Sequence, residues 1–544
     1  MTPTMEKRYQ TGAISVIALL IVVAALSAHF RSLGGPFQFD DERDIVYRPA
    51  VSQGAAAAAR SSPYRALTYV SYAVDWKRGG GDAKAFHVTN LAIHIMASLL
   101  LFFVLRRIFN PSKLREEAAI AAGAIAFAVH PVGAAAVDYI SGRAGMISAV
   151  GGLLMVLIWL GGNFRGKWAL LAAVEAVALL GKEDAVAFPL VIGAFWLIDR
   201  KGRIFDIAPS LIVAAIYGAA RVFSHPVVVS EPGREVSLAS HILIQPYVYF
   251  RAFLAWLQPL GLSVDHHVNP ILSAGDVRLW LCGIAMSAAI LLIAFAVKRG
   301  NKIAGIATAW FVLALAPQAA VPLADPISQN RWYFAIAGLA VAAAGAIRWV
   351  MNRNSKLAVV LAAAWLVCLF PITTQRAARW ADPPALWAES VKLYPSAGRP
   401  WSNYAQATLR QGRPRSAVRA ARRALEMERE DALTWNTLGL ALKDLGKYED
   451  ALDAYDRAIF FDAGLFIAYI NRANVLAAIG KLEDAETCYR QALRMAPQNP
   501  DAHYGLAWVL ANTGRLAEAK KHLQIVLKIN PDDLDAKQLS DQLK

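Results

Sequence analysis

Four carboxylates lie within five consecutive positions, about ten residues after the first strongly apolar segment. They are Asp40, Asp41, Glu42 and Asp44, and they follow Phe39. Acidic side chains are costly to bring near lipid, so a cluster beside a membrane span calls for a reason. A carboxylate pair can take a proton from an attacking hydroxyl, with one member as base and the other orienting it or binding a metal. The competing interpretation is a solvated acidic loop.

Further charged residues lie in the short connections between apolar segments. The candidates are His130, Asp138, Arg143, Lys182, Glu183, Asp265, His266 and Arg331. Arginine and lysine suit a phosphate, and a carboxylate beside a cation fits transfer of a group from a lipid phosphate to a hydroxyl. Each residue also has a plain structural interpretation. His130 before Pro131 can cap a helix, and Arg143 can extend to a lipid headgroup.

The composition is that of a polytopic membrane protein with a soluble part. Hydrophobic residues make up 56% of the 544 residues, and the mean hydropathy is +0.37. Expected spans fall near 11–30, 86–105, 118–135, 141–161, 168–181, 184–198, 205–222, 277–297, 302–316, 332–350 and 356–372. The net charge of +15 does not indicate nucleic acid, because many Lys and Arg lie in loops between spans. Three cysteines without a CxxC pair indicate neither a disulfide framework nor zinc.

The basic loops predict the orientation in the membrane. Loops at 165–167, 200–203, 298–302 and 348–356 mark the cytoplasmic side. The segment 240–260 is aromatic and amphipathic, and a crossing there would move the later basic loops outside. We therefore expect an interfacial helix or a short hairpin. The N-terminus is then cytoplasmic, the first apolar run is a retained signal-anchor, and the C-terminal part is outside.

After residue 372 the sequence repeats itself with a period of 34 residues. The registers are Trp401, Trp435, Tyr469 and His503; Gly412, Gly446, Gly480 and Gly514; and Ala417, Ala451, Ala485 and Ala519. This is the tetratricopeptide-repeat (TPR) pattern, in which small residues let two helices approach closely. The predicted domains are 1–372 for the membrane part, 373–397 for a junction with half a TPR unit, repeats at 398–431, 432–465, 466–499 and 500–533, and a capping helix at 534–544.

The polar stretches together resemble the transmembrane and tetratricopeptide-repeat O-mannosyltransferases. The resemblance begins at Phe39-Asp40-Asp41 and continues in order through 63–68, 127–131, 140–144, 181–183, 262–266 and 322–326. With the repeats it covers nearly the whole chain. The family belongs to the C-type glycosyltransferase superfamily (GT-C), whose multi-spanning members take sugar from a polyprenyl phosphate on the outer or lumenal face.

The resemblance implies an all-α fold, a GT-C-like polytopic bundle followed by a TPR α-solenoid, in a bacterial inner-membrane protein. It implies inverting transfer of a mannose-like hexose to a hydroxyl of a protein or glycan. Asp41, in preference to Asp40, would take the proton, and Arg143, Lys182 and Arg331 would neutralise the departing lipid phosphate. The expected supporting residues are Glu42, His130, Asp138, Glu183, Asp265 and His266.

The expected partners are membrane lipid, a polyprenyl-phosphate-linked sugar, and a protein or peptide acceptor held by the concave surface of 398–533. No cofactor is assigned, and a divalent metal stays open because the run 265–267 has no decisive ligand spacing. No Walker loop, GxGxxG or GxSxG motif is present. The alternatives are a non-enzymatic TPR scaffold for an envelope complex, and a flippase or polymerase of lipid-linked glycans.

Overall fold

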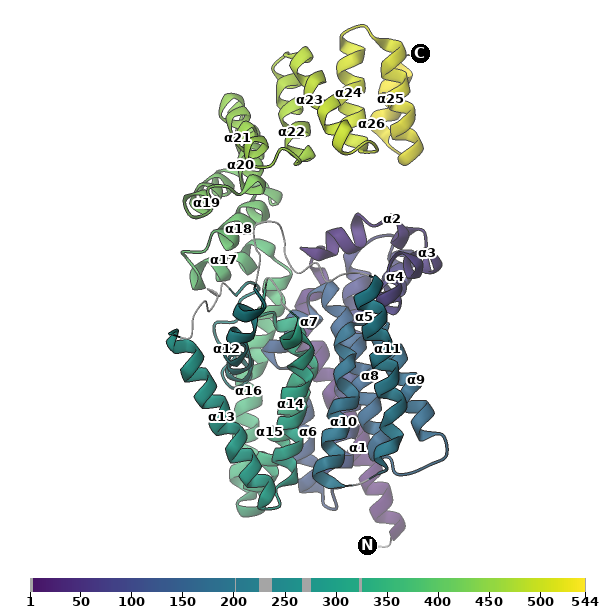
Figure 1. Cartoon of the computed structure of the whole chain (residues 1–544), viewed down its shortest axis with the longest axis vertical. Coiled ribbons are helices and arrows are strands. Elements are labelled where there is room, and N and C mark those ends of the chain that lie inside the picture. Colours follow the sequence, from purple (N-terminus) through teal and green to yellow (C-terminus); the bar gives the residue numbers. More distant parts are fainter. Residues whose placement is uncertain (1–2, 201, 225–236, 267–274, 322–324, 544) are drawn as a thin grey trace. The chain divides into compact units, whose positions relative to one another are not determined.

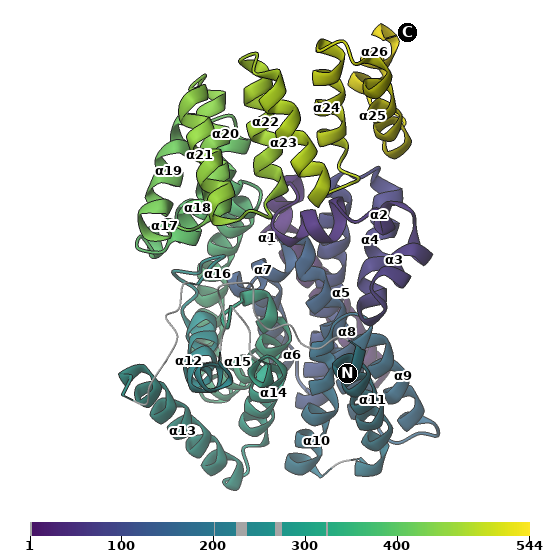
Figure 2. The same cartoon turned by 45° about the horizontal axis from the view of Figure 1, so that its top comes forward.

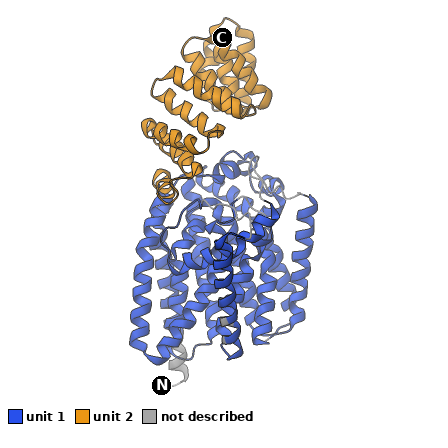
Figure 3. Ribbon diagram, turned by 60° about the vertical axis from the view of Figure 1, so that its left-hand side comes forward, with its two compact units in different colours: residues 1–382 blue, residues 383–544 orange. Residues whose placement is uncertain are grey.

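The computed structural model consists of helices joined by short connections, with no strand among the residues that it describes (Figure 1). Those residues are 3–200, 202–224, 237–266, 275–321 and 325–543. The chain divides into two compact units, Met1–Asp382 and Pro383–Lys544, which Figure 3 colours separately. The prediction of an all-α chain with a C-terminal helical repeat is confirmed.

Unit 1 is a bundle of long apolar helices with a small helical cluster after the first of them. The long helices are α1 Pro3–His29, α5 Ala83–Phe109, α6 Leu114–Ala128, α8 Arg143–Leu160, α9 Lys167–Leu179, α10 Phe188–Asp199, α11 Ala208–Ser224, α12 Leu238–Leu257, α13 Val277–Lys298, α14 Lys302–Ala320, α15 Tyr333–Arg353 and α16 Ser355–Trp380. The small cluster contains α2 Pro49–Ser52, α3 Ala55–Ser61 and α4 Ala66–Gly79.

Several helices begin where the sequence supplies a capping side chain. Asp82 accepts a hydrogen bond from the backbone N–H of Lys84 at the start of α5. Asp276, Asn301 and Asn354 do the same at the starts of α13, α14 and α16. These caps satisfy N–H groups that the first turn of a helix leaves without a partner.

Eight helical segments of the described residues are long and apolar enough to cross a membrane. They contain α1, α5, α6, α8, α11, α14, α15 and α16. Of the other three expected spans, α9 has 13 residues and α10 has 12, and α13 has a shorter apolar stretch, Val277–Ala288. The segment expected at the interface forms α12, which is not among the eight. The count of eleven crossings stays a prediction.

Most of the long helices of unit 1 run side by side, so the connections gather at two ends (Figure 1), while α13 slants away from the others (Figure 2). One end holds the basic loops, where ion pairs join neighbouring helices. Arg106 pairs with Glu117 at 2.8 Å, Arg348 with Glu116 at 3.1 Å and Lys302 with Asp199 at 2.5 Å. The acidic segment after α1 lies at the other end, which we call the acidic end. It also holds the connections α6–α8, α9–α10 and α14–α15.

The boundary of the membrane part differs from the expected residue 372. Helix α16 continues through Pro371 to Trp380, and Arg376 and Trp380 are buried in unit 1. A proline inside a helix removes one hydrogen bond without ending a helix that its neighbours support. The residues 373–380, expected in the junction, therefore belong to α16.

Unit 2 is a stack of helix pairs. After α17 Pro383–Leu393 come the pairs α18 Gly398–Arg410 with α19 Pro414–Met427, α20 Ala432–Asp444 with α21 Tyr448–Phe461, α22 Phe466–Ala478 with α23 Leu482–Met495, and α24 Pro500–Asn512 with α25 Leu516–Ile529, followed by α26 Leu534–Gln542. The glycine between the helices of each pair has a positive φ, from +68° at Gly412 to +81° at Gly480. Only glycine adopts this conformation without steric cost, which explains its 34-residue period.

Candidate active site

Asp41 is held inside the acidic end by three hydrogen bonds. Its carboxylate accepts from the backbone N–H and hydroxyl of Ser141, at 2.8 and 2.5 Å, and from the backbone N–H of Gln38 at 3.0 Å. The residue is only 1% exposed. These bonds tie the segment after α1 to the connection before α8. Asp41 therefore fixes the position of the acidic loop.

Asp40, by contrast, directs its side chain to solvent. The side chain is 53% exposed and lies 3.0 Å from Arg43, while the backbone N–H donates to the hydroxyl of Tyr139 at 3.1 Å. The preceding Phe39 has a φ of +52°, which is uncommon for a bulky residue and marks a constrained turn. Phe39 packs edge-on against Tyr139 and Trp380, which stack on one another. The aromatic packing thus holds Asp40 out at the surface.

The other two acidic side chains of this loop lie in a single π-helical turn, Glu42–Val46. Glu42 is partly buried. Asp44 lies 3.1 Å from Arg43 and 3.9 Å from Arg48. These two arginines therefore neutralise Asp44, which lies close to the acidic pair Asp40 and Asp41.

Burial raises the pKa of Asp41 to about 7 from its ordinary value of 3.8, although the bonds from Ser141 and Gln38 favour the charged form. A raised pKa in the folded state means that the fold binds the proton more tightly than the unfolded chain. The contribution of protonated Asp41 to the free energy of unfolding is complete below about pH 4 and is lost as the pH rises towards 7. We expect the difference in melting temperature between wild type and Asp41→Asn to change across this interval in detergent. Parallel pH profiles for the two proteins would contradict the assignment.

Arg143 is completely buried and all its bonding is internal. Its guanidinium donates to the oxygens of Asn90 and Phe86, both at 2.7 Å, and to the hydroxyl of Ser71 at 3.1 Å. It also pairs with Asp75 at 2.7 Å. The role in phosphate binding expected for Arg143 stays a prediction. Its observed contacts join α4, α5 and α8 behind the acidic loop.

We expect Arg143→Met to destabilise unit 1 by about 3–5 kcal/mol, because Asp75 would stay buried without its main counter-charge. Asp75 has a second arginine partner, Arg78, at 2.9 Å, which is 53% exposed. Arg78→Met is the matched control, with an expected cost of about 1 kcal/mol or less. Thermal unfolding in detergent compares the two. Equal losses would contradict the structural role of Arg143.

A second group of charges surrounds the connection between α9 and α10. Arg65 forms a two-pronged ion pair with Glu183, in which its Nε lies 3.0 Å from Oε2. Burial opposes ionisation of Glu183, but the charge and hydrogen bonds of Arg65 outweigh it and lower the pKa. Lys182 lies 2.6 Å from Asp184. The first turn of α4 is fixed here by the bond from the hydroxyl of Thr68 to the carbonyl of Gly181, at 2.9 Å.

Arg331 joins this group from the 3₁₀ turn Gln329–Trp332, directly before α15. Its guanidinium donates to the carbonyl of Asp325 at 2.7 Å and lies within electrostatic range of Glu183 and Asp184. Arg65, Lys182 and Arg331 carry three positive charges beside the carboxylates of Glu183 and Asp184, and the carboxylate of Asp325 also interacts with Arg331. We call the first five of these residues the cation cluster.

Helix α4 connects the cation cluster with the acidic loop. Tyr69 interacts electrostatically with Asp44 of the acidic loop and with Arg65 of the cluster, and the guanidinium of Arg48 lies 4.4 Å above its ring. Tyr72, one turn on, interacts with Asp41. The two groups of charges therefore border the same short helix.

An apolar pocket of about 410 Å³ opens beside the cation cluster. Its lining comes from α5, α8 and α9, and includes Ile93, Leu154 and Val177. Leu67 of α4 also lines it, two residues from Arg65, and donates its backbone N–H to the carbonyl of Leu180 at 3.0 Å. An apolar chain in this pocket could present a polar head to the cluster.

The remaining predicted residues have structural partners. The imidazole of His130 accepts from the backbone N–H of Val132 at 3.3 Å, as a helix cap, and its Nε2 lies 2.8 Å from the carbonyl of Trp256. Asp138 lies 2.8 Å from Nδ1 of His29, with both side chains buried. This pair holds the connection before α8 against α1.

Asp265 and His266 lie in a separate buried group next to α16. The amide of Gln329 bonds to His266 at 2.8 Å and to the carbonyl of Ser263 at 3.0 Å, and its oxygen accepts from Arg376. Burial, with the nearby Arg251 and Arg376, lowers the pKa of His266 to about 3. His267 and residues 322–324, part of the stretches singled out in the sequence, lie outside the described residues. No group of three His, Cys, Asp or Glu in the described part of the chain could hold a metal ion.

Sequence reasoning missed Arg65, Ser141 and Asp75. Arg65 and Ser141 lie inside stretches that carry the family resemblance, so that signal could have identified them. Asp75 carried a weaker signal, as a single acid in the middle of α4. Its pairing with Arg143 joins residues far apart in the sequence and became visible only in the fold.

Comparisons with known proteins agree with the repeats and with the resemblance. A family model described as "Tetratricopeptide repeat" matches residues 404–465 and 470–533. The chain is 28% identical over 222 residues to "Protein O-mannosyl-transferase Tmtc1" of Drosophila melanogaster, covering 37% of this chain and 25% of that protein. It is 27% identical over 350 residues to "Protein O-mannosyl-transferase TMTC4" of Mus musculus, covering 49% of this chain and 47% of that protein.

The chain thus spans between a quarter and about half of the length of these curated relatives. Among solved structures, the TPR protein YrrB is 20% identical, with a TM-score of 0.26, covering 36% of this chain and 98% of that one. A score this low adds nothing on function. The chain is therefore a multi-pass helical protein with a tetratricopeptide-repeat unit, and its sequence relatives are TMTC protein O-mannosyl-transferases.

Proposed function

We propose that this chain is a membrane glycosyltransferase that moves a mannose-like hexose from a polyprenyl phosphate to a hydroxyl of a protein or glycan acceptor. The observation that carries the proposal is the pairing of an exposed and a buried aspartate in one loop, next to a helix that borders the cation cluster. General-base and phosphate-binding chemistry need these two kinds of group close together. The names of the relatives support the same reaction.

The geometry favours Asp40 over Asp41 as the base. Asp41 was preferred from the sequence, but it is 1% exposed and both its oxygens already accept hydrogen bonds. Asp40 is adjacent and 53% exposed, so an acceptor hydroxyl can reach it. In this proposal Asp41 is a positioning residue that holds Asp40 at the mouth of the site. Arg143, through Asp75 and Asn90, supports the elements behind it.

The proposed reaction is a single displacement. The acceptor oxygen attacks the anomeric carbon, its proton passes to the Asp40 carboxylate, and the bond from that carbon to the phosphate oxygen breaks. The configuration inverts, and polyprenyl phosphate leaves with the bonding electrons. Arg65, Lys182 and Arg331 would balance the charge that develops on the phosphate. The apolar pocket beside Leu67 would hold the first part of the lipid chain.

The proposed orientation has the acidic end and the repeats on the outer face of a bacterial inner membrane, with the N-terminus in the cytoplasm. The ion-paired basic loops at the opposite end of unit 1 support it, because Lys and Arg favour the cytoplasmic side. An impermeant thiol reagent should label a cysteine placed at Asp382 in intact spheroplasts. Labelling that requires lysis would overturn the orientation.

Three measurements on purified protein separate the enzyme from its rivals: the mannose on acceptor protein, the free polyprenyl phosphate, and the movement of the lipid across a vesicle bilayer. A polyprenyl-phosphate mannose and an envelope protein fraction should yield labelled protein and free polyprenyl phosphate. A scaffold would yield neither product. A flippase would move the lipid across a vesicle bilayer and leave the sugar–phosphate bond intact.

A further inference from the structure

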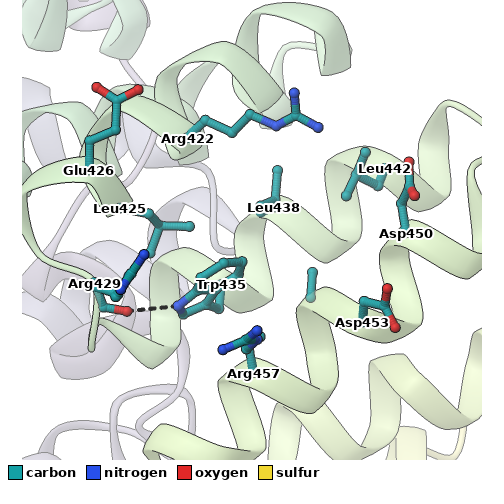
Figure 4. Close-up of a pocket in the computed structure, with 11 residues that line it drawn as sticks. Arg422, Leu425, Glu426, Arg429, Trp435, Leu438, Leu442, Asp450, Asp453 and Arg457 are labelled. Carbon is teal, nitrogen blue, oxygen red and sulfur yellow. Dashed lines mark hydrogen bonds between the residues drawn. The ribbon is translucent and has the colours of Figure 1, made fainter.

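A groove of about 910 Å³ lies between two repeats of unit 2 (Figure 4). Its floor is helix α20, with the partly exposed Trp435 and with Leu438 and Leu442, which are only 5% and 3% exposed. Its two walls are α19 and α21, the second helices of the first and second repeats. The charged lining residues are Arg422, Glu426, Arg429, Asp450, Asp453 and Arg457.

This groove is not on the concave surface for which the sequence predicted acceptor binding. The first helices of consecutive repeats, α18 with α20 and α20 with α22, pack against one another and form the inner side of the curve. The groove is walled by second helices, which splay apart. It therefore opens on the convex side of the stack.

The two walls carry opposite charge. The first wall lines the groove with Arg422, Glu426 and, just after α19, Arg429, and the second lines it with Asp450, Asp453 and Arg457. The first wall is therefore net positive and the second net negative. Figure 4 shows Arg422 and Arg429 on one side of the apolar floor and Asp450 and Asp453 on the other. A ligand for this groove must be apolar in the middle and carry two edges of opposite charge.

The next groove along the stack, between α21 and α23, is closed by one of its own side chains. Arg472 occupies the position of α22 that corresponds to Leu438, 34 residues earlier. Its guanidinium pairs with Asp456 of α21 at 2.7 Å and contacts Cys488 of α23 at 3.0 Å. The floor of this second groove is thereby bridged to both walls.

The third groove, between α23 and α25, is closed by ion pairs across its walls. Arg490 of α23 pairs with Glu518 of α25, and Glu486 of α23 pairs with Arg515 before α25 at 2.7 Å. Two repeats earlier, Arg422 and Asp450 occupy the positions of Arg490 and Glu518.

The corresponding ion pair is not formed in the first groove. Among residues 383–543, all of which are described, Arg422 makes no ion pair, and neither do Asp450 and Asp453 across the groove. The first groove thus combines an apolar floor with unbridged walls, where its two counterparts are sealed. Complementary charges left apart on the two sides of a groove favour a ligand that brings the opposite charge to each side.

We propose that the groove between α19 and α21 binds an amphipathic helix of a partner protein, with an apolar stripe between an acidic edge and a basic edge. The acidic edge lies against Arg422 and Arg429, and the basic edge against Asp450 and Asp453. The stripe lies over Trp435 and over the small exposed parts of Leu438 and Leu442. In the third groove, Arg490 and Glu518 form an ion pair with each other across the groove. In the first groove, the charged edges of the bound helix form ion pairs with the two walls instead.

The test uses full-length protein in detergent and a labelled, stapled helical peptide with Leu at the stripe, Glu along one edge and Lys along the other. A second peptide has the two edges exchanged. Fluorescence anisotropy should show the first peptide binding about tenfold more tightly than the second. The variant Arg422→Glu/Arg429→Glu/Asp450→Lys/Asp453→Lys should reverse that preference. Arg419→Glu, on the same helix but outside the groove, should leave it unchanged.

A variant that closes the groove gives an independent readout. Leu438→Arg copies the residue found at the same register in α22 and should abolish peptide binding, with circular dichroism confirming that the repeats stay folded. Equal binding of both peptides, or binding that survives Leu438→Arg, would overturn the proposal. A dimer of the full chain that dissociates on Leu438→Arg would also overturn it, in favour of a second copy as the occupant.

Discussion

The variant Asp40→Asn should transfer sugar about two or more orders of magnitude more slowly than wild type, with its thermal stability unchanged. The side chain of Asp40 is exposed and pairs with Arg43, which is itself exposed. The asparagine amide should therefore disturb little of the structure. The amide cannot accept the proton of the attacking hydroxyl. Single-turnover transfer from polyprenyl-phosphate mannose measures the loss, and differential scanning fluorimetry measures the stability.

Two other variants of the same loop serve as comparisons for Asp40→Asn. Asp44→Asn removes the same charge a few residues away and should keep its activity within about twofold, because Asp44 is paired with Arg43 and Arg48. Asp41→Asn should lose both activity and stability, because an amide NH₂ would replace an oxygen that accepts from Ser141 or Gln38. If Asp40→Asn were fully active while Asp41→Asn was stable but inactive, Asp41 would be the base.

Arg65→Gln is expected to lower kcat by about a hundredfold, because one of three cations would no longer meet the departing phosphate. Arg65 is also the partner of Glu183, so a loss alone would not separate the two roles. The double variant Arg65→Gln/Glu183→Gln resolves this ambiguity, because it removes both charges and leaves no unpaired carboxylate.

If Arg65 binds phosphate, the double variant should recover stability but stay as slow as Arg65→Gln. Recovery of kcat in the double variant would show instead that Arg65 serves only to hold Glu183. Arg65→Lys provides a second comparison. It keeps the charge but loses the planar two-pronged geometry, and an intermediate rate is expected.

The features that could be predicted from the sequence are those with a local or periodic cause. The repeat pairs follow from glycines that need a positive φ and from Ala417 and its equivalents, which are buried where two helices meet. The acidic loop was recognisable because carboxylates are rare beside a membrane span. Basic residues at helix ends likewise indicated which loops would gather at the same end of the bundle.

The roles of individual residues depend on contacts between distant segments, and the sequence does not show these. Asp40 and Asp41 are neighbours of identical type, and only the approach of Ser141 and Tyr139 makes one buried and the other exposed. Arg143 resembled a surface cation until the fold brought Asp75 and Asn90 to it. The last span was expected to end near residue 372, but packing within unit 1 carries α16 on through Pro371 to Trp380.

The most direct measurement is the release of polyprenyl phosphate by purified full-length protein given polyprenyl-phosphate mannose and an envelope protein fraction. The proposed reaction predicts release that depends on the acceptor, equals the mannose found on protein, and disappears in the double variant Asp40→Asn/Asp41→Asn. Equal release by wild type and by a folded double variant would contradict the assignment of the acidic loop as the catalytic centre.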